Sequence, residues 1–325
     1  MRSGGIGDAV RTAPERVLRT GLLALSHRRV VGRIATGMPL TRPFVDRFVA
    51  GQTLVEALPR LRRLADAGFR TTVDLLGESV THADAASAAA DRYLETLEAL
   101  AAGSLDRNVS LKLSQMGMAI DPALARANLE RIVARASSLD AFVRIDMEDS
   151  STVDATLALH RDLWASHNNV GVVIQSALRR STADVDALIT EGVRVRLCKG
   201  AYKEPASVAF PTKPEVDDSF AILMERLLGE GAYPAFATHD ERLIRRAIAI
   251  ARRDHVTADR FEFQMLYGVR RDLQDRLLAA GYTVRLYVPF GREWYPYFMR
   301  RLAERPANVA FLVRSVLREQ RGDSA

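Results

Sequence analysis

Cysteine is nearly absent from this sequence, with Cys198 alone among 325 residues. One cysteine excludes an internal disulfide and any zinc or iron–sulfur site built from several cysteines, and it is typical of a protein in a reducing cytoplasm. The 6 histidines are scattered without the spacing of metal ligands, so we predict no metal site. We expect Cys198, which falls inside a predicted strand, to pack rather than react.

Long hydrophobic runs are also missing. The apolar run GLLALS at 21–26 is too short to span a membrane or to direct export, and an acidic residue stands in the first ten residues, where a signal peptide needs positive charge. We therefore expect no transmembrane helix and a cytoplasmic location.

The usual nucleotide-binding motifs are absent as well. No G-x-G-x-x-G follows the first predicted strand, and no G-x-x-x-x-G-K-[ST] occurs anywhere. The net charge of +6 comes from 46 basic and 40 acidic residues spread along the chain. Without a DNA- or RNA-reading motif, this distribution is typical of a solvated surface, and we expect no nucleic-acid partner.

What the sequence does contain is a regular alternation of short apolar runs and helical periodicity from about residue 70 onward. The eight runs are TVDLLGE (72–78), SLKLSQMG (110–117), AFVRIDMED (141–149), VGVVIQSA (170–177), VRVRLCKG (193–200), YPAFATHD (233–240), FEFQMLYG (261–268) and YTVRLYVPFG (282–291). Eight such units favour an α/β fold with a closed (β/α)8 TIM barrel over a doubly wound sheet, which stays the alternative.

The first 60 residues predict a helical arm, so we divide the chain into an arm at 1–60 and a barrel with C-terminal helices at 61–325. Val17, Leu18, Leu22 and Leu25 recur at helical spacing among arginines. Such a helix packs on the main domain in the simpler interpretation. A basic amphipathic helix can also rest on an anionic membrane surface.

Charged residues recur at every second position of several predicted strands, which is unusual for parallel strands covered on both faces. We expect them to point into the barrel. The cations are Lys112, Arg144, Arg194, Arg196 and Arg285, and the acids are Asp146, Glu148 and Glu262. Interior ion pairs account for some of these charges, and the surplus of positive charge predicts an anionic ligand.

Active sites of TIM barrels lie at the carboxyl ends of the strands. The residues placed there are Asp146, Gln175, Arg196, Lys199, Thr238, His239, Leu266 and Tyr287. After the last strand, Tyr297, Arg300, Arg301 and Glu304 share one helical face, which is either a solvated ion-pair face or a binding site for a small carboxylate. The residues alone indicate an enzyme with an anionic substrate, but not its reaction.

At these motifs the sequence resembles the proline dehydrogenase family, in its short monofunctional bacterial form, from about residue 50 to 315. The matching motifs are SLKLSQMG, VRIDMED, VVIQSALRRS, VRLCKGAY, FATHD, EFQMLYG, RLYVPFG and WYPYFMRRLAERPANV. The resemblance implies a distorted (β/α)8 barrel with noncovalent FAD at the carboxyl ends of the strands. It also implies a C-terminal helix over the barrel mouth.

The resemblance also implies roles for individual residues. Asp146 and Arg196 are the catalytic residues. FAD contacts are Met147, Gln175, Arg196, Lys199, Gly200, Ala201, Thr238 and His239, with Tyr202 close to the flavin. Substrate contacts are Lys112, Leu266, Tyr287, Tyr297, Arg300, Arg301 and Glu304. Arg300, Arg301 and Lys112 would bind the substrate carboxylate.

The implied reaction is oxidation of L-proline to Δ1-pyrroline-5-carboxylate by hydride transfer to flavin N5, the first step of proline degradation to glutamate. The implied electron acceptor is a membrane quinone, reached by peripheral contact with the inner face of the cell membrane. Because the chain ends soon after the last predicted helix, we expect a separate aldehyde dehydrogenase to act next.

Three other functions are compatible with parts of the pattern. A hydroxyproline dehydrogenase of the same family is one alternative, because the extra hydroxyl of that substrate adds little volume. Family members that prefer hydroxyproline resemble this pattern but have a serine at the position of Tyr287, so Tyr287 argues against this alternative. A flavin-free aldolase would use Lys112 or Lys199 as a Schiff base. The third alternative is a non-catalytic amino-acid-binding barrel that has lost its cofactor. The residues that match flavin contacts are retained here, which argues against it.

Overall fold

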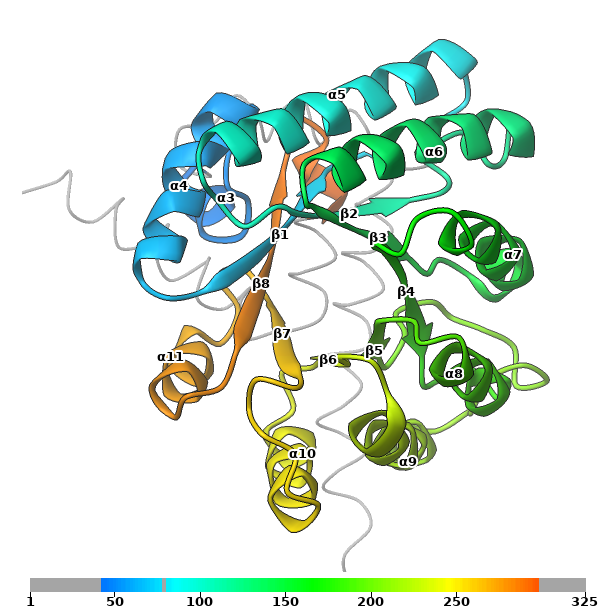
Figure 1. Cartoon of the computed structure of the whole chain (residues 1–325), viewed down its shortest axis with the longest axis vertical. Coiled ribbons are helices and arrows are strands. Elements are labelled where there is room, and N and C mark those ends of the chain that lie inside the picture. Colours follow the sequence, from blue (N-terminus) through cyan, green and yellow to red (C-terminus); the bar gives the residue numbers. More distant parts are fainter. Residues whose placement is uncertain (1–41, 78–79, 298–325) are drawn as a thin grey trace, which may run out of the picture.

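The computed structural model describes residues 42–77 and 80–297, and its eight strands form a closed parallel barrel in which β8 pairs with β1 (Figure 1). The strands are β1 (Arg70–Leu75), β2 (Asn108–Lys112), β3 (Phe142–Asp146), β4 (Val170–Gln175), β5 (Val195–Cys198), β6 (Ala235–Ala237), β7 (Glu262–Leu266) and β8 (Val284–Phe290). Each observed strand starts within two residues of the start of its predicted run. The closed ring of eight parallel strands confirms the predicted (β/α)8 barrel.

Helices surround the strands in a ring (Figure 1). They are α3 (Arg42–Phe48), α4 (Leu54–Asp66), α5 (Ala83–Ala102), α6 (Pro122–Ser138), α7 (Val153–Trp164), α8 (Ser181–Thr190), α9 (Lys213–Glu230), α10 (Glu241–Arg253) and α11 (Arg271–Ala279), with a short 3-10 turn, η2 (Ser150–Thr152), before α7. The predicted division at residue 60 falls inside α4, and residues 1–41 of the arm lie outside the described residues. Among the helices of the described ranges, none is long and apolar enough to cross a membrane.

Local sequence explains where helices begin. Thr212 forms a capping box with Glu215 at the start of α9, and Asp121 caps α6, where proline opens the helix. After β6, the Asp240 carboxylate accepts a hydrogen bond from the Arg242 backbone N–H at 3.1 Å and begins α10. These caps therefore fix where the loops after β2, β5 and β6 end.

The strands separate apolar from polar side chains by alternation. In β3, Val143 and Ile145 belong to the apolar core, whereas the intervening Arg144 is a buried cation. Arg196 on β5 donates a hydrogen bond of 2.9 Å to Ser110 on β2. Because β2 and β5 are not neighbours in the sheet, this bond crosses the barrel interior. This contact places the Arg196 side chain in the barrel interior, as predicted.

One buried histidine gives the core a dependence on pH. His160 on α7 is fully buried, its ring stacks on Trp164 with centroids 5.9 Å apart, and its Nε2 lies 3.4 Å from the Val170 carbonyl oxygen. Burial lowers the pKa of His160 from 6.5 to about 4. The unfolded chain therefore binds a proton at a higher pH than the folded chain, and stability is lost as pH falls from 6.5 toward 4.

We expect the free energy of unfolding to fall by about 2 kcal/mol more in the wild type than in His160→Gln between about pH 7.5 and about pH 5. Urea unfolding of both proteins at the two pH values measures this difference. The same pH dependence in both proteins would show that His160 does not cause it.

Candidate active site

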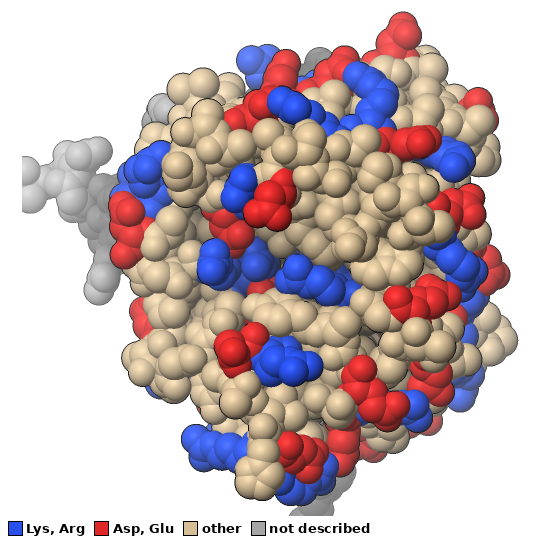
Figure 2. Space-filling model, viewed as in Figure 1, with Lys and Arg blue, Asp and Glu red and all other residues tan. Residues whose placement is uncertain are grey.

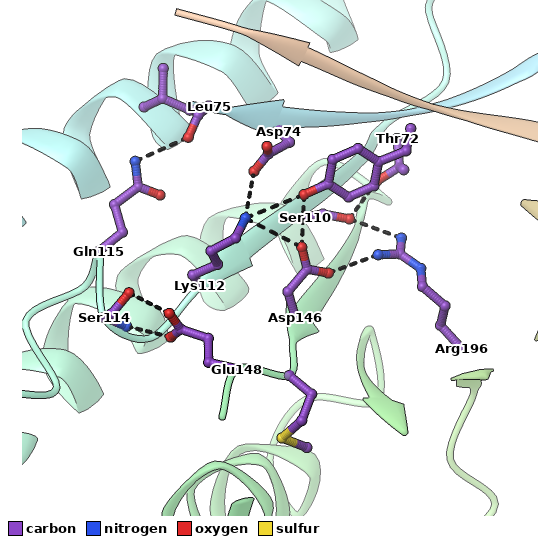
Figure 3. A network of polar contacts seen from close by, with 12 residues as sticks. Thr72, Asp74, Leu75, Ser110, Lys112, Ser114, Gln115, Asp146, Glu148 and Arg196 are labelled. Atoms are coloured by element: carbon purple, nitrogen blue, oxygen red, sulfur yellow. Dashed lines mark hydrogen bonds and ion pairs between the residues drawn. The ribbon is translucent and has the colours of Figure 1, made fainter. Parts of the chain in front are cut away.

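A polar network joins four strands at the carboxyl ends of the barrel (Figure 3). The Asp146 carboxylate, at the end of β3, accepts a hydrogen bond of 2.7 Å from Arg196 Nη1 and another of 2.7 Å from the Tyr287 hydroxyl. Lys112, at the end of β2, places its Nζ 3.6 Å from Asp146 Oδ2 and 3.4 Å from the Tyr287 oxygen. The structure thus brings together four predicted site residues, with Arg196, Tyr287 and Lys112 around the Asp146 carboxylate.

Arg196 is the most firmly held member of this network. The residue is 4% exposed, and its guanidinium lies over the Tyr287 ring at 5.4 Å from the centroid and donates to both Asp146 and Ser110. The Ser110 hydroxyl in turn contacts Thr72 Oγ1 at 2.9 Å. A buried cation fixed by two hydrogen bonds is a preorganised positive charge, which can stabilise negative charge that develops beside it.

Asp74 on β1 belongs to the same network, although the sequence analysis did not assign it. Its side chain is almost fully buried, and Lys112 Nζ lies 3.5 Å from Asp74 Oδ1. Burial raises the pKa of Asp74, and the Asp146 carboxylate raises it further, while the Lys112 ammonium opposes both. Alternation in TVDL, with Thr72 and Asp74 sharing one face, was the signal that could have found it.

The predicted count of interior charges needs correction. Glu148 follows the end of β3 and binds the Ser114 backbone N–H and hydroxyl, at 2.9 and 2.6 Å, in the loop after β2, so it is not a barrel-interior acid. Asp74 and Asp106 take its place as partners of Lys112 and Arg285. Among the described residues, the five predicted cations of the barrel interior therefore face four acids, Asp74, Asp106, Asp146 and Glu262.

The Tyr287 hydroxyl acts as a donor in this environment. Desolvation raises the pKa of Tyr287 well above its usual value, and the Asp146 and Asp74 carboxylates raise it further. The phenol therefore stays protonated at neutral pH and donates to Asp146. This bond fixes the tyrosine side chain, whose hydroxyl also lies 3.4 Å from Lys112 Nζ.

Residues predicted to contact a cofactor lie after β3, β4 and β5. Gln175 Nε2 donates to the carbonyl oxygens of Met147, at 3.2 Å, and Glu148, at 2.9 Å. Gly200 has φ of +103°, and a Cβ at that position would lie 3.3 Å from both Ala177 Cβ and Gln175 Oε1. Glycine at 200 therefore allows the loop after β5 to approach Gln175 closely. The following residue, Ala201, is exposed, as is Tyr202.

Lys199 is held by two carboxylates. Its Nζ lies 2.5 Å from Asp217 Oδ1 on α9 and 3.0 Å from Asp240 Oδ2 at the start of α10. Burial lowers the pKa of Lys199, but the hydrogen bonds to Asp217 and Asp240 outweigh this effect and raise it overall. The ammonium is therefore a stable positive charge at the mouth, shared with its acidic partners. Sequence reasoning identified Lys199 but neither of these aspartates as its partners.

Two further predicted residues meet after β6 and β7. His239 Nε2 accepts a hydrogen bond of 3.0 Å from the Leu266 backbone N–H, so the neutral ring carries its proton on Nδ1. Leu266 pairs in register with Tyr287, which brings both to the same level of the barrel. Thr238 is buried, and its hydroxyl accepts a hydrogen bond from the Asp240 backbone N–H at 3.1 Å.

The predicted helical stripe after β8 is only partly described. Tyr297 is 6% exposed and follows Trp294 and Tyr295, which are also buried. The predicted substrate contacts Arg300, Arg301 and Glu304 lie outside the described residues.

Other chemistries find little support in the part of the chain that the structure describes. Burial raises the pKa of Cys198 to about 11, which keeps its thiol protonated and unreactive. No group of three or more potential metal ligands occurs among the described residues. The candidate site is therefore the network around Asp146 with the loops after β4 to β7.

We expect Asp146→Asn to lower the free energy of unfolding by about 3 kcal/mol, because it leaves the buried Arg196 cation without its carboxylate. Asp91→Asn is the matched control. Asp91 pairs with Arg131 at 2.6 Å, but both side chains are about half exposed, so its loss should cost under about 1 kcal/mol. Urea unfolding measures both changes, and equal losses would contradict the importance of the buried pair.

In sequence and fold, this chain is similar to known proteins. The family model for proline dehydrogenase matches residues 57–314. Proline dehydrogenase 1 of Bacillus subtilis subsp. natto is 39% identical over 303 residues, covering 93% of this chain and 100% of the relative. Proline dehydrogenase of Deinococcus radiodurans is 39% identical over 309 residues, covering 94% and 99%.

Among solved structures, proline utilization A from Bdellovibrio bacteriovorus, inactivated by N-propargylglycine, matches with a TM-score of 0.75 and 26% identity. The match covers 80% of this chain and 32% of that one, so this chain spans about a third of the larger protein. With a family model that matches most of its length and relatives aligned from end to end, this chain belongs to the proline dehydrogenase family.

Proposed function

We propose that this proline dehydrogenase oxidises L-proline to Δ1-pyrroline-5-carboxylate with bound FAD, as the first step of proline degradation to glutamate. The observation that carries the proposal is the network of Lys112, Tyr287, Asp146 and Arg196 at the carboxyl ends of the strands. It provides a cation for a carboxylate, an aromatic wall and a buried guanidinium in one place.

The residues present fit a flavin cofactor. Arg196 Nε is buried and has no hydrogen-bond partner among the described residues, so one donor of this fixed guanidinium is still available. Gly200 permits close approach at the loop after β5, where the Lys199 ammonium is shared with Asp217 and Asp240. The residues that would hold FAD are Met147, Gln175, Arg196, Lys199, Gly200, Ala201, Thr238 and His239. When bound, FAD supplies the acceptor for the hydride that proline loses.

On the substrate side, Lys112 would bind the carboxylate of proline, together with Arg300 and Arg301, and Glu304 would orient the arginine pair. Tyr287, Leu266 and Tyr297 would enclose the pyrrolidine ring. Held this way, the ring carbon that lies beside the nitrogen and does not carry the carboxylate loses a hydride, and the amine loses a proton, which leaves the imine product. Asp146 acts by fixing Arg196 and Tyr287 through its two hydrogen bonds.

The visible absorption spectrum of the purified protein tests cofactor and substrate together. We expect a yellow protein whose flavin band bleaches under anaerobic conditions when L-proline is added. A flavin band unchanged by proline would reject the substrate, and a protein that stays colourless after reconstitution with FAD would reject the cofactor. A colourless protein that forms a borohydride-trapped adduct with a carbonyl substrate would favour the aldolase alternative.

Hydroxyproline is the alternative substrate, and Tyr287 is the residue that should exclude it. The Tyr287 hydroxyl is already bonded to Asp146, and its ring lies against the Arg196 guanidinium. We expect Tyr287→Ser to raise the ratio of kcat/KM for hydroxyproline over proline by about tenfold. Tyr287→Phe keeps the ring and is the matched control. Equal ratios in both variants would remove Tyr287 as the discriminating residue.

The electron acceptor and location complete the proposal. Electrons would pass to a membrane quinone, with the protein in the cytoplasm and touching the inner face of the cell membrane through its basic N-terminal arm. A separate aldehyde dehydrogenase would act on the product, and the support is that the two bacterial relatives are matched over 100% and 99% of their own length.

Deletion of residues 1–30 tests the membrane contact. We expect the shortened protein to bind anionic liposomes less and to turn over quinone more slowly, while proline still bleaches its flavin at the rate of the full chain. Neutral liposomes serve as the control for charge. Undiminished binding to anionic liposomes would exclude the arm as the contact.

A further inference from the structure

A second hollow lies at the opposite end of the barrel from the proposed proline site. It has a volume of about 830 Å³ and is lined by residues at the amino ends of the strands, among them Arg70, Asn108, Phe142, Arg194 and Arg285. Basic side chains gather at the hollowed centre of the face in Figure 2, inside the ring of helices. Its volume is within the usual range of ligand sites.

Arg194 is the central residue of this hollow. Its Cζ lies 4.5 Å from the centroid of the Phe142 ring and 4.6 Å from that of Tyr233, so the guanidinium is clamped between two aromatic faces. Arg144 also lies over the Phe142 ring, with its Cζ 4.9 Å from the centroid. Among the described residues, no carboxylate lies within 4.0 Å of the Arg194 guanidinium.

The backbone conformation helps to position the two rings, Phe142 and Tyr233, that contact Arg194. Tyr233 has φ of +51°, a left-handed conformation that costs a bulky residue roughly 1–2 kcal/mol, and its hydroxyl donates to Glu262 Oε2 at 3.3 Å. At Gly171 a Cβ would lie 2.7 Å from Arg144 Nη1 and 2.8 Å from the Phe142 ring, so only glycine leaves room for the stack. Strained positions of this kind are concentrated at binding sites.

The surplus of positive charge predicted from the sequence is found here. Arg285 binds both nearby carboxylates, Glu262 at 2.8 Å and Asp106 at 2.6 Å. Arg144 donates to the carbonyl oxygens of Val172 and Arg194 and pairs with no described carboxylate. Burial lowers the pKa of Arg194, and the Arg285 cation lowers it further, whereas Glu262 opposes both. This end of the barrel therefore keeps cations that the described protein does not neutralise.

One donor of the Arg194 guanidinium lacks a partner. Arg194 Nε is buried and has no hydrogen-bond partner in the described chain. A buried polar group without a partner costs free energy unless a ligand or water satisfies it. A buried N–H donor on a fixed guanidinium suits a ligand oxygen that accepts hydrogen bonds.

From these observations we infer that the amino-terminal mouth of the barrel is a second binding site, for a small oxyanion that carries a carboxylate or phosphate group. Arg194 forms the charged contact, held in place by Phe142 and Tyr233. The aromatic clamp fixes the guanidinium before the ligand arrives, which reduces the entropy lost on binding. The site is independent of the proline site and of its cofactor.

Isothermal titration calorimetry of the full-length, flavin-loaded protein tests this site, with sodium phosphate and sodium succinate as probes and chloride holding the ionic strength constant. We expect saturable binding of at least one probe, weakened at least tenfold by Arg194→Gln. The tighter probe distinguishes a phosphate from a carboxylate ligand. Arg246→Gln is the matched control, because Arg246 is an exposed arginine on α10, away from the hollow, and its loss changes the net charge equally.

Binding that is equal in the wild type and Arg194→Gln, or absent for both probes, would overturn the proposal. Succinate that entered the proline site instead would bind the wild type and Arg194→Gln with equal affinity. If Arg194→Gln does not fold, the site is tested in the wild type by phenylglyoxal modification of its arginines, followed by peptide mass spectrometry. Phosphate or succinate should then protect Arg194 and leave Arg246 reactive, and equal modification of Arg194 with and without the probes would reject the site.

Discussion

The ion pair between Arg196 and Asp146 is the interaction on which the candidate active site depends. The two residues come from strands that are not neighbours in the barrel, and both side chains lie in the interior, where an unpaired charge is costly. Each partner then fixes another group, since Asp146 holds the Tyr287 hydroxyl and Arg196 holds the Ser110 hydroxyl. The pair thus determines the positions of side chains contributed by four strands.

Most of the architecture could be predicted because it rests on local patterns. Apolar runs bounded by turns placed all eight strands, and polar residues at period two identified the interior of the barrel. The predicted strand starts differ from the observed ones by at most two residues, as at β1, which begins at Arg70 rather than Thr72. Strand ends depend on hydrogen bonds to neighbouring strands, which a single run does not contain.

The polar contacts were harder to predict. Asp106 lies in a loop before β2, and its partner Arg285 is 179 residues away in the sequence, so no spacing rule connects them. In the sequence, Glu148 continues the alternation of β3. The strand ends at Asp146, however, and the Glu148 side chain binds Ser114 instead. The surplus of positive charge was predicted, and its main place proved to be the amino-terminal mouth, where Arg194 lies between two rings.

Asp240 performs two tasks with one carboxylate, and this links the mouth of the barrel to the helices outside it. One oxygen begins α10 by accepting the Arg242 N–H, and the other contacts Lys199 after β5. A ligand that drew Lys199 away would leave the carboxylate freer to rotate, and the first turn of α10 would lose part of its anchor. Amide hydrogen exchange at the start of α10 would then report, from the protein surface, whether the mouth is filled.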